Sequence, residues 1–144
     1  MEPAEIRAED FLPHRGRMKL VDEIITVDAE MAVTRARVTD QWPFFDGKAV
    51  NSLVLIELVA QTAGISNSWC GGKKHGENFL TKGWLVGIKE SRFYIDRVPL
   101  DTPIITRCIN QFEFDGYRVI RGTVEIEKRL VAEVELQLVQ SDGD

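Results

Sequence analysis

Leu53-Val-Leu-Ile-Glu-Leu-Val-Ala-Gln-Thr-Ala-Gly-Ile65 is the stretch that decides the fold, and it holds a single carboxylate, Glu57. A helix that is apolar on all sides is typical of one buried inside a domain. Removing an ionised carboxylate from water is costly unless another group pairs with it. Glu57 is therefore either satisfied by its neighbours or kept for chemistry, and we favour chemistry.

The limits of this helix follow from the residues around it. Asn51 or Ser52 can cap its start, because either side chain can accept a hydrogen bond from an unpaired amide. The helix is predicted to end near Ser68. Cys70 to Lys82 is then predicted to be a polar, glycine-bearing loop with His75 exposed in it.

Segments rich in β-branched and aromatic residues lie on both sides of the helix and predict strands. The predicted strands are Met18 to Val27, Met31 to Val38, Trp84 to Ile95, Ile104 to Phe114, Tyr117 to Glu127 and Leu130 to Gln140. Asp115-Gly116 predicts a tight hairpin turn, and Lys128-Arg129 marks the next reversal.

The order of elements is two strands, a long helix and a four-strand meander. It predicts one α+β domain over residues 1–144, with an antiparallel sheet wrapped around the central helix. A sheet of this kind has edges whose backbone groups need partners, so a dimer formed through the sheet is expected.

Composition excludes several classes of function. A net charge of -5 predicts no general attraction to nucleic acid or to an anionic membrane. Cys70 and His75 lack a second pair of ligands, so no metal is predicted, and no motif implies a cofactor. The N-terminal residues do not resemble a secretory signal and no apolar run is long enough to cross a bilayer, so a cytoplasmic setting is expected.

Three blocks in order resemble the hotdog-fold FabA/FabZ-type 3-hydroxyacyl-ACP dehydratases. The first block is Leu12-Pro-His-Arg15 continuing through Met18-Lys-Leu-Val-Asp22. The second is Phe44 with the run from Val54 to Gly64. The third is Gly87-Ile-Lys-Glu-Ser-Arg-Phe93 followed by Val98-Pro-Leu-Asp101. Diverged relatives of this kind also occur in polyketide-type pathways such as aryl-polyene synthesis, and they have similar Phe-Phe and helix sequences.

The resemblance implies a thioester substrate on a phosphopantetheine arm, carried by ACP or coenzyme A. It implies a homodimer, or a multiple of one, whose site joins a histidine of one subunit to a carboxylate on the partner's central helix. Glu57 falls where that carboxylate belongs. The residues expected to line the substrate are Phe44, Ser52, Leu53 and Gln61, with amides at the helix start holding the thioester oxygen.

The chain departs from the family pattern at the histidine. Counting back from Glu57 places that histidine on Pro43, within Trp42-Pro-Phe-Phe45, which cannot take a proton. The family's Pro-Gly before the helix is replaced by Asn51-Ser52. A positioned base is worth about 10²- to 10⁴-fold in rate, so the usual mechanism does not carry over unchanged.

Three interpretations follow. In the first, His14 acts with Glu57 in a divergent dehydratase. In the second, the chain is a non-catalytic subunit that completes an active relative, and Glu57 is a structural carboxylate bonded to Gln61 one turn on. In the third, Glu57 alone serves an acyl thioesterase. The basic cluster Arg15-Gly-Arg-Met-Lys19 would suit an acidic carrier protein, although a solvated turn is the more ordinary interpretation.

Overall fold

The computed structural model describes residues 19–75 and 84–140, and the side chains of residues 19–66 and 87–139. His14, predicted to be catalytic, lies outside these ranges. The central helix α1 (Val54–His75) begins where it was expected to begin. It continues past Ser68, so the loop predicted from Cys70 is wrong as far as His75. Two glycines, Gly71 and Gly72, weaken a helix without ending it, because each still contributes its amide and its carbonyl.

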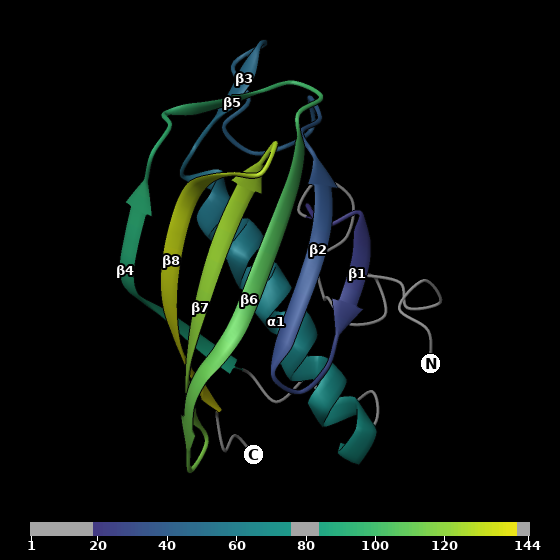
Figure 1. Cartoon of the computed structure of the whole chain (residues 1–144), viewed down its shortest axis with the longest axis vertical. Coiled ribbons are helices and arrows are strands. Elements are labelled where there is room, and N and C mark those ends of the chain that lie inside the picture. The colour runs from purple at the N-terminus through teal and green to yellow at the C-terminus, as the bar shows by residue number, and fades with distance from the viewer. Residues whose placement is uncertain (1–18, 76–83, 141–144) are drawn as a thin grey trace.

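One antiparallel sheet of six strands wraps around α1, as Figure 1 shows, and this confirms the α+β class. Its strand order is β1-β2-β6-β7-β8-β4. The strands are β1 (Glu23–Val27), β2 (Met31–Arg37), β4 (Trp84–Phe93), β6 (Pro103–Phe114), β7 (Tyr117–Ile126) and β8 (Arg129–Gln140). A second, two-stranded sheet joins β3 (Ala49–Asn51) to β5 (Arg97–Pro99).

The predicted four-strand meander is wrong in one respect. Only β6, β7 and β8 follow one another as neighbours, whereas β4 pairs with β8. The side-chain pattern of a strand shows that it belongs to a sheet, but it does not show which edge of the sheet it joins. The position of β4 is important for the site, because it makes β4 an edge strand.

The two hairpin turns differ in how closely they match their predictions. Asp115 and Gly116 have φ angles of 50° and 85°, the left-handed pair that a tight two-residue turn requires. The next turn is formed by Glu127 and Lys128, with φ angles of 53° and 67°, one position before the predicted reversal.

The core lies between the inner face of the sheet and α1. On β8 the residues Ala132, Val134, Leu136 and Leu138 are buried, which confirms the predicted alternation. Gly122 of β7 packs directly against α1, since an added Cβ there would meet Val59 Cγ1 at 2.4 Å. Among the described residues, no helix is long and apolar enough to cross a bilayer.

Candidate functional site

Glu57 lies on a face of α1 that is only partly buried among the residues whose side chains the structure describes. Between residues 54 and 66 most side chains are buried, and those that are not fall at helical spacing with Leu53. We call this set the open stripe: Leu53, Ile56, Glu57, Ala60 and Gly64. The apolar run suggested a helix buried on all sides, but α1 between residues 54 and 66 is only partly buried along this stripe. Glu57 is the only ionisable member of an otherwise apolar surface.

Gln61 fixes the orientation of the Glu57 carboxylate. Its Nε2 donates to Glu57 Oε2 at 3.0 Å, while its Oε1 accepts from the amides of Leu20 at 2.9 Å and Val21 at 3.4 Å. Gln61 is only 2% exposed. Two backbone donors at one end of the side-chain amide determine which end is oxygen, so the nitrogen must face Glu57.

This bond was expected if Glu57 were purely structural, but its setting agrees with a functional role as well. Gln61 is buried and anchored from a distant segment, whereas Glu57 is only partly buried on the open stripe. A carboxylate that is held in a fixed orientation and remains partly exposed can meet a substrate. The first turn of a helix also favours a negative charge, because of the unpaired amides there.

The start of α1 is held by local and distant hydrogen bonds. Asn51 Oδ1 accepts from the Leu53 amide at 2.9 Å, as a capping side chain does. The Ser52 amide donates to the Asp96 carbonyl at 2.9 Å, which ties the helix start to the segment before β5. The amides of Ser52 and Leu53 therefore already donate within the chain, so a thioester oxygen would need another donor here.

The residues expected to line the substrate occupy different settings. Leu53, at 51% exposed, begins the open stripe one turn before Glu57, whereas the Ser52 side chain is buried. Phe44 lies in the loop before β3 and is 62% exposed, with a φ of 64°. The structure thus brings Leu53, Glu57 and Gln61 together and presents Phe44 on a separate loop.

The loop that holds Phe44 is ordered by its other residues. Trp42 is buried in the core, and Asp46 accepts from the amides of Lys48 and Ala49 at 2.9 and 3.0 Å. Asp46 also forms an ion pair with Arg97 of β5. The two amides, followed by Arg97, hold the pKa of Asp46 below its usual value.

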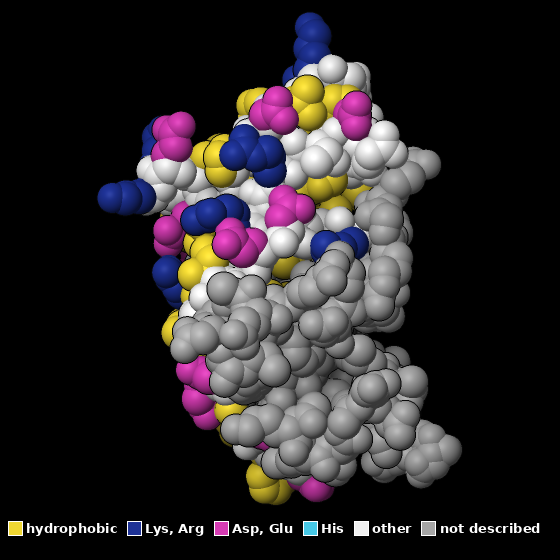
Figure 2. All heavy atoms as spheres, turned by 90° about the vertical axis from the view of Figure 1, so that its right-hand side faces the viewer, with side chains coloured by type: hydrophobic (Ala, Val, Ile, Leu, Met, Phe, Trp, Pro, Cys, Tyr) yellow, Lys and Arg dark blue, Asp and Glu magenta, His cyan; other side chains and the backbone are white. Residues whose placement is uncertain are grey.

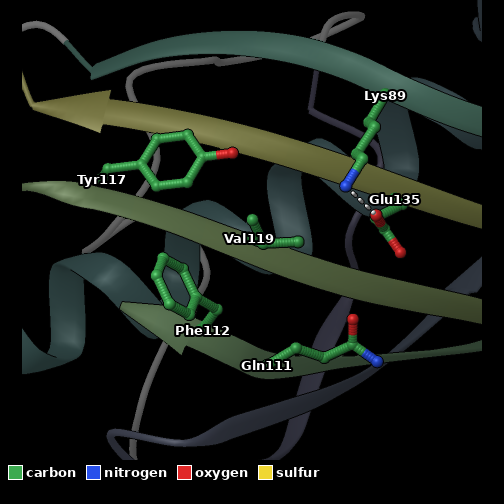
Figure 3. Close-up of a pocket in the computed structure, with 6 residues that line it drawn as sticks. All are labelled: Lys89, Gln111, Phe112, Tyr117, Val119 and Glu135. Atoms are coloured by element: carbon green, nitrogen blue, oxygen red, sulfur yellow. Dashed lines mark ion pairs between the residues drawn. The ribbon is translucent and has the colours of Figure 1, made fainter. Parts of the chain in front are cut away.

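Two hollows of the described surface lie away from Glu57. One, of about 440 Å³, is bordered by β5 and the β7–β8 turn and includes Arg97 and Arg129. The other, of about 640 Å³, lies on the outer face of the sheet (Figure 3). Glu57 lines neither of these two hollows.

Sequence reasoning missed one part of this site. The amides of Leu20 and Val21, which anchor Gln61, carry no side-chain signal, and only the folded chain shows that they lie beside α1. The open stripe, in contrast, could have been found from helical spacing around Glu57.

Comparison with known proteins gives the same family by two routes. The family of ApeP-like dehydratases, described as ApeP dehydratase, matches residues 6–144. The 3-hydroxyacyl-[acyl-carrier-protein] dehydratase FabZ of Streptococcus pneumoniae is 37% identical over 132 residues, covering 86% of this chain and 88% of that protein. FabZ of Streptococcus pyogenes is 31% identical over 137 residues, covering 92% of this chain and 93% of that protein.

Solved structures show the same fold at lower sequence identity. The dehydratase heterocomplex ApeI:P from Xenorhabdus doucetiae matches with a TM-score of 0.80 and 16% identity, covering 95% of this chain and 92% of that one. A hypothetical thioesterase of Streptococcus pneumoniae matches with a TM-score of 0.58 and 14% identity, covering 83% of this chain and 88% of that one. These likenesses confirm the predicted hotdog fold.

Proposed function

The chain belongs to the ApeP-like dehydratase family, and we propose that Glu57 is the residue through which it acts on 3-hydroxyacyl thioesters. Its function is that of a divergent 3-hydroxyacyl-ACP dehydratase-like protein of fatty-acid or polyketide-type metabolism. The observation that carries the proposal is the place of Glu57: a carboxylate held in orientation by Gln61, on an otherwise apolar open stripe.

The proposed reaction removes water from the acyl chain. A base takes a proton from C2, the freed electron pair forms the C2–C3 double bond, and the C3–O bond breaks. An acid protonates the leaving hydroxyl, which departs as water. In this proposal Glu57 supplies the proton to the hydroxyl and His14 takes the proton from C2, while Leu53 and Phe44 contact the acyl chain.

The site is proposed to be shared between two subunits that pair through β4. This strand ends the six-stranded sheet, so one of its backbone edges has no neighbouring strand among the described residues. The residues from Gly87 to Arg92 are exposed on both faces. An exposed edge strand of this kind is a ready template for pairing with a second chain. A second chain there would extend the sheet and could bring a covering segment to the open stripe.

Turnover of a 3-hydroxyacyl-ACP thioester tests the role of Glu57. Glu57→Gln keeps the shape of the side chain and its contact with Gln61 but removes the acid, so we expect a loss of about 10²-fold or more. Glu30→Gln, an exposed glutamate outside the site, is the matched control and should keep the native rate. Native turnover by Glu57→Gln would contradict the proposal. Release of free carrier thiol in place of enoyl product would instead support the thioesterase interpretation.

A second candidate function is favoured by Pro43, which stands where the family has its histidine. The structural neighbour from Xenorhabdus doucetiae is a dehydratase heterocomplex, ApeI:P. In this candidate a different hotdog chain supplies the histidine to the open stripe. Co-expression with a histidine-bearing homologue distinguishes the two candidates: a stable complex that is active only when both chains are present favours the second, and full turnover by the chain alone excludes it.

A further inference from the structure

The hollow between β5 and the β7–β8 turn brings two arginines together with apolar side chains. Its volume of about 440 Å³ is typical of a site for a small ligand. Arg97 of β5 and Arg129 of β8 line it from opposite elements. The apolar residues of the lining are Ile95, Pro99, Ile126, Leu130 and Val131. A ligand that fits this lining carries an anionic group beside a compact apolar one.

Arg129 is available to bind an anion. Its side chain is exposed, and no acid among the described residues forms an ion pair with it. Arg97 donates to Asp46 through Nη2, but its side chain remains 51% exposed. A guanidinium has five N–H donors, so Arg97 can still donate to a second acceptor. Charge-assisted hydrogen bonds from two guanidinium groups are well suited to the oxygens of a phosphate.

The other polar groups of the hollow leave this task to the arginines. Tyr94 donates its hydroxyl proton to Glu133 at 2.6 Å, and Thr102 donates to the Pro99 carbonyl at 2.7 Å. Glu127 is the one acid among the described residues of the lining. The same turn holds Lys128, so basic residues outnumber acids around the hollow even when Asp46 is included.

This local excess of basic residues contrasts with the rest of the chain, whose net charge is -5. On the face that Figure 2 shows, basic and acidic side chains are interspersed over the described part. That face offers no broad cationic surface to an acidic partner. Recognition of a single anionic group by the hollow does not depend on such a surface.

The small sheet connects the hollow to the start of α1. Arg97 pairs in register with Asn51 of β3, and Asn51 caps the helix through the Leu53 amide. The residue before Arg97, Asp96, accepts from the Ser52 amide at 2.9 Å. A group bound beside Arg97 is therefore one strand away from Leu53, where the open stripe begins.

We propose that this hollow binds the phosphate of a phosphopantetheine arm. The proposal rests on the proposed function, because the arm belongs to the same thioester substrate. Arg129 and Arg97 bind the phosphate oxygens, and Leu130, at 42% exposed, packs against the two methyl groups that this arm carries next to its phosphate. The rest of the arm extends past Leu53 toward Glu57. An acyl carrier protein and coenzyme A share this chemistry.

Isothermal titration calorimetry of the full chain with phosphopantetheine and with pantetheine tests the proposal. The native chain should bind the phosphorylated compound at least about 10-fold more tightly, and Arg129→Gln should lose most of that difference. Arg35→Gln is the matched control, because Arg35 is exposed on β2 and does not line the hollow. This variant should bind both compounds as the native chain does.

Turnover identifies the source of the phosphate. If the arm of ACP binds here, Arg129→Gln should raise KM for 3-hydroxyacyl-ACP about 10-fold and leave kcat unchanged. A rise confined to the coenzyme A thioester assigns the hollow to coenzyme A. In both cases the phosphate-free pantetheine thioester should be turned over equally by the native chain and by Arg129→Gln.

Three results would overturn the proposal. The first is equal affinity of the native chain for the two compounds, or no binding of either at millimolar concentration. The second is a loss in Arg129→Gln no larger than in Arg35→Gln. The third is an equal rise in KM for the phosphate-free thioester.

Calorimetry needs no turnover, so it separates this proposal from the role of Glu57. Glu57→Gln should bind phosphopantetheine as tightly as the native chain. A native chain that binds the phosphate but dehydrates no thioester would contradict the proposed function alone. A native chain that is active but does not distinguish phosphopantetheine from pantetheine would contradict this proposal alone.

Discussion

Gln61 shows how a single side chain joins parts of the molecule that are distant in sequence. It accepts from amides near residue 20 and donates to Glu57. In Gln61→Leu those buried amides lose their acceptor, at a cost of about 1–3 kcal/mol in unfolding free energy. Glu57 also loses its fixed orientation. We expect kcat to fall about 10- to 100-fold with KM little changed.

Steady-state kinetics with 3-hydroxyacyl-ACP and urea unfolding measure the two effects of Gln61→Leu separately. Gln41→Leu, at an exposed glutamine, is the control and should be neutral in both. If Gln61→Leu lost stability but kept its kcat, Gln61 would be structural and would not position Glu57.

Asp46 offers a test that depends on pH. Its pKa is lowered in the folded chain by the amides of Ala49 and Lys48, so its contribution to stability is present above the unfolded pKa. That contribution is lost as pH falls through the lower folded value. Asp46→Asn keeps an acceptor oxygen but no charge, so its stability deficit should be full at pH 7 and should shrink below about pH 4. The stability deficit of Asp46→Asn is measured by unfolding midpoints between pH 7 and pH 3. Asp40→Asn is the control. A deficit independent of pH would contradict the assignment.

Among the elements, the contact between β7 and α1 depends on Gly122. A Cβ there would lie 2.4 Å from Val59 Cγ1. Valine has little rotamer freedom in a helix, so it cannot move aside easily. Gly122→Ala should destabilise the fold by about 1–3 kcal/mol.

Gly87 of β4 gives the matched control for this contact. A Cβ at Gly87 would meet Gln137 Oε1 at 3.6 Å, an ordinary contact. Thermal melting should show a clear loss for Gly122→Ala and little change for Gly87→Ala. Equal melting temperatures for the two variants would mean that the helix can shift at little cost.

The sequence predicted the elements that have strong local signals, and it missed those that depend on distant contacts. The alternation along β8 and the turn at Asp115 could be predicted from the sequence, because the side-chain period of a strand and the residue preferences of a turn are local. The three-residue strands β3 and β5 were too short to have a period. The place of β4 beside β8 depends on the path of the chain between them, which no local pattern encodes.

The residues of the candidate site also differ in whether a local sequence signal or a distant contact reveals them. Glu57 stood out because a charge in an apolar run is visible in any sequence. The open stripe and the anchor of Gln61 depend on what surrounds α1 in three dimensions. The role of His14 stays a prediction, because the family position is Pro43 and His14 lies outside the described residues.

For the whole molecule, pairing through β4 predicts that assembly and activity depend on the same edge. Ile88 of β4 is 53% exposed, and Ile88→Asp should place an uncompensated charge in the paired sheet. Sedimentation velocity should show half the native mass, and turnover should fall with it. Ile25→Asp on β1, the opposite edge strand, is the control and should keep both. Native mass and native turnover in Ile88→Asp would exclude β4 as the pairing edge.

The central claim is that one site combines Glu57 of one subunit with a histidine of the other. Glu57→Gln and His14→Ala chains, co-expressed with different tags or exchanged in mild denaturant, test it most directly. Each variant alone should be inactive in dehydration. The mixture should recover about a quarter of native turnover, because half of the random pairs are mixed and each mixed pair has one intact site. A mixture no more active than either variant alone would contradict the claim.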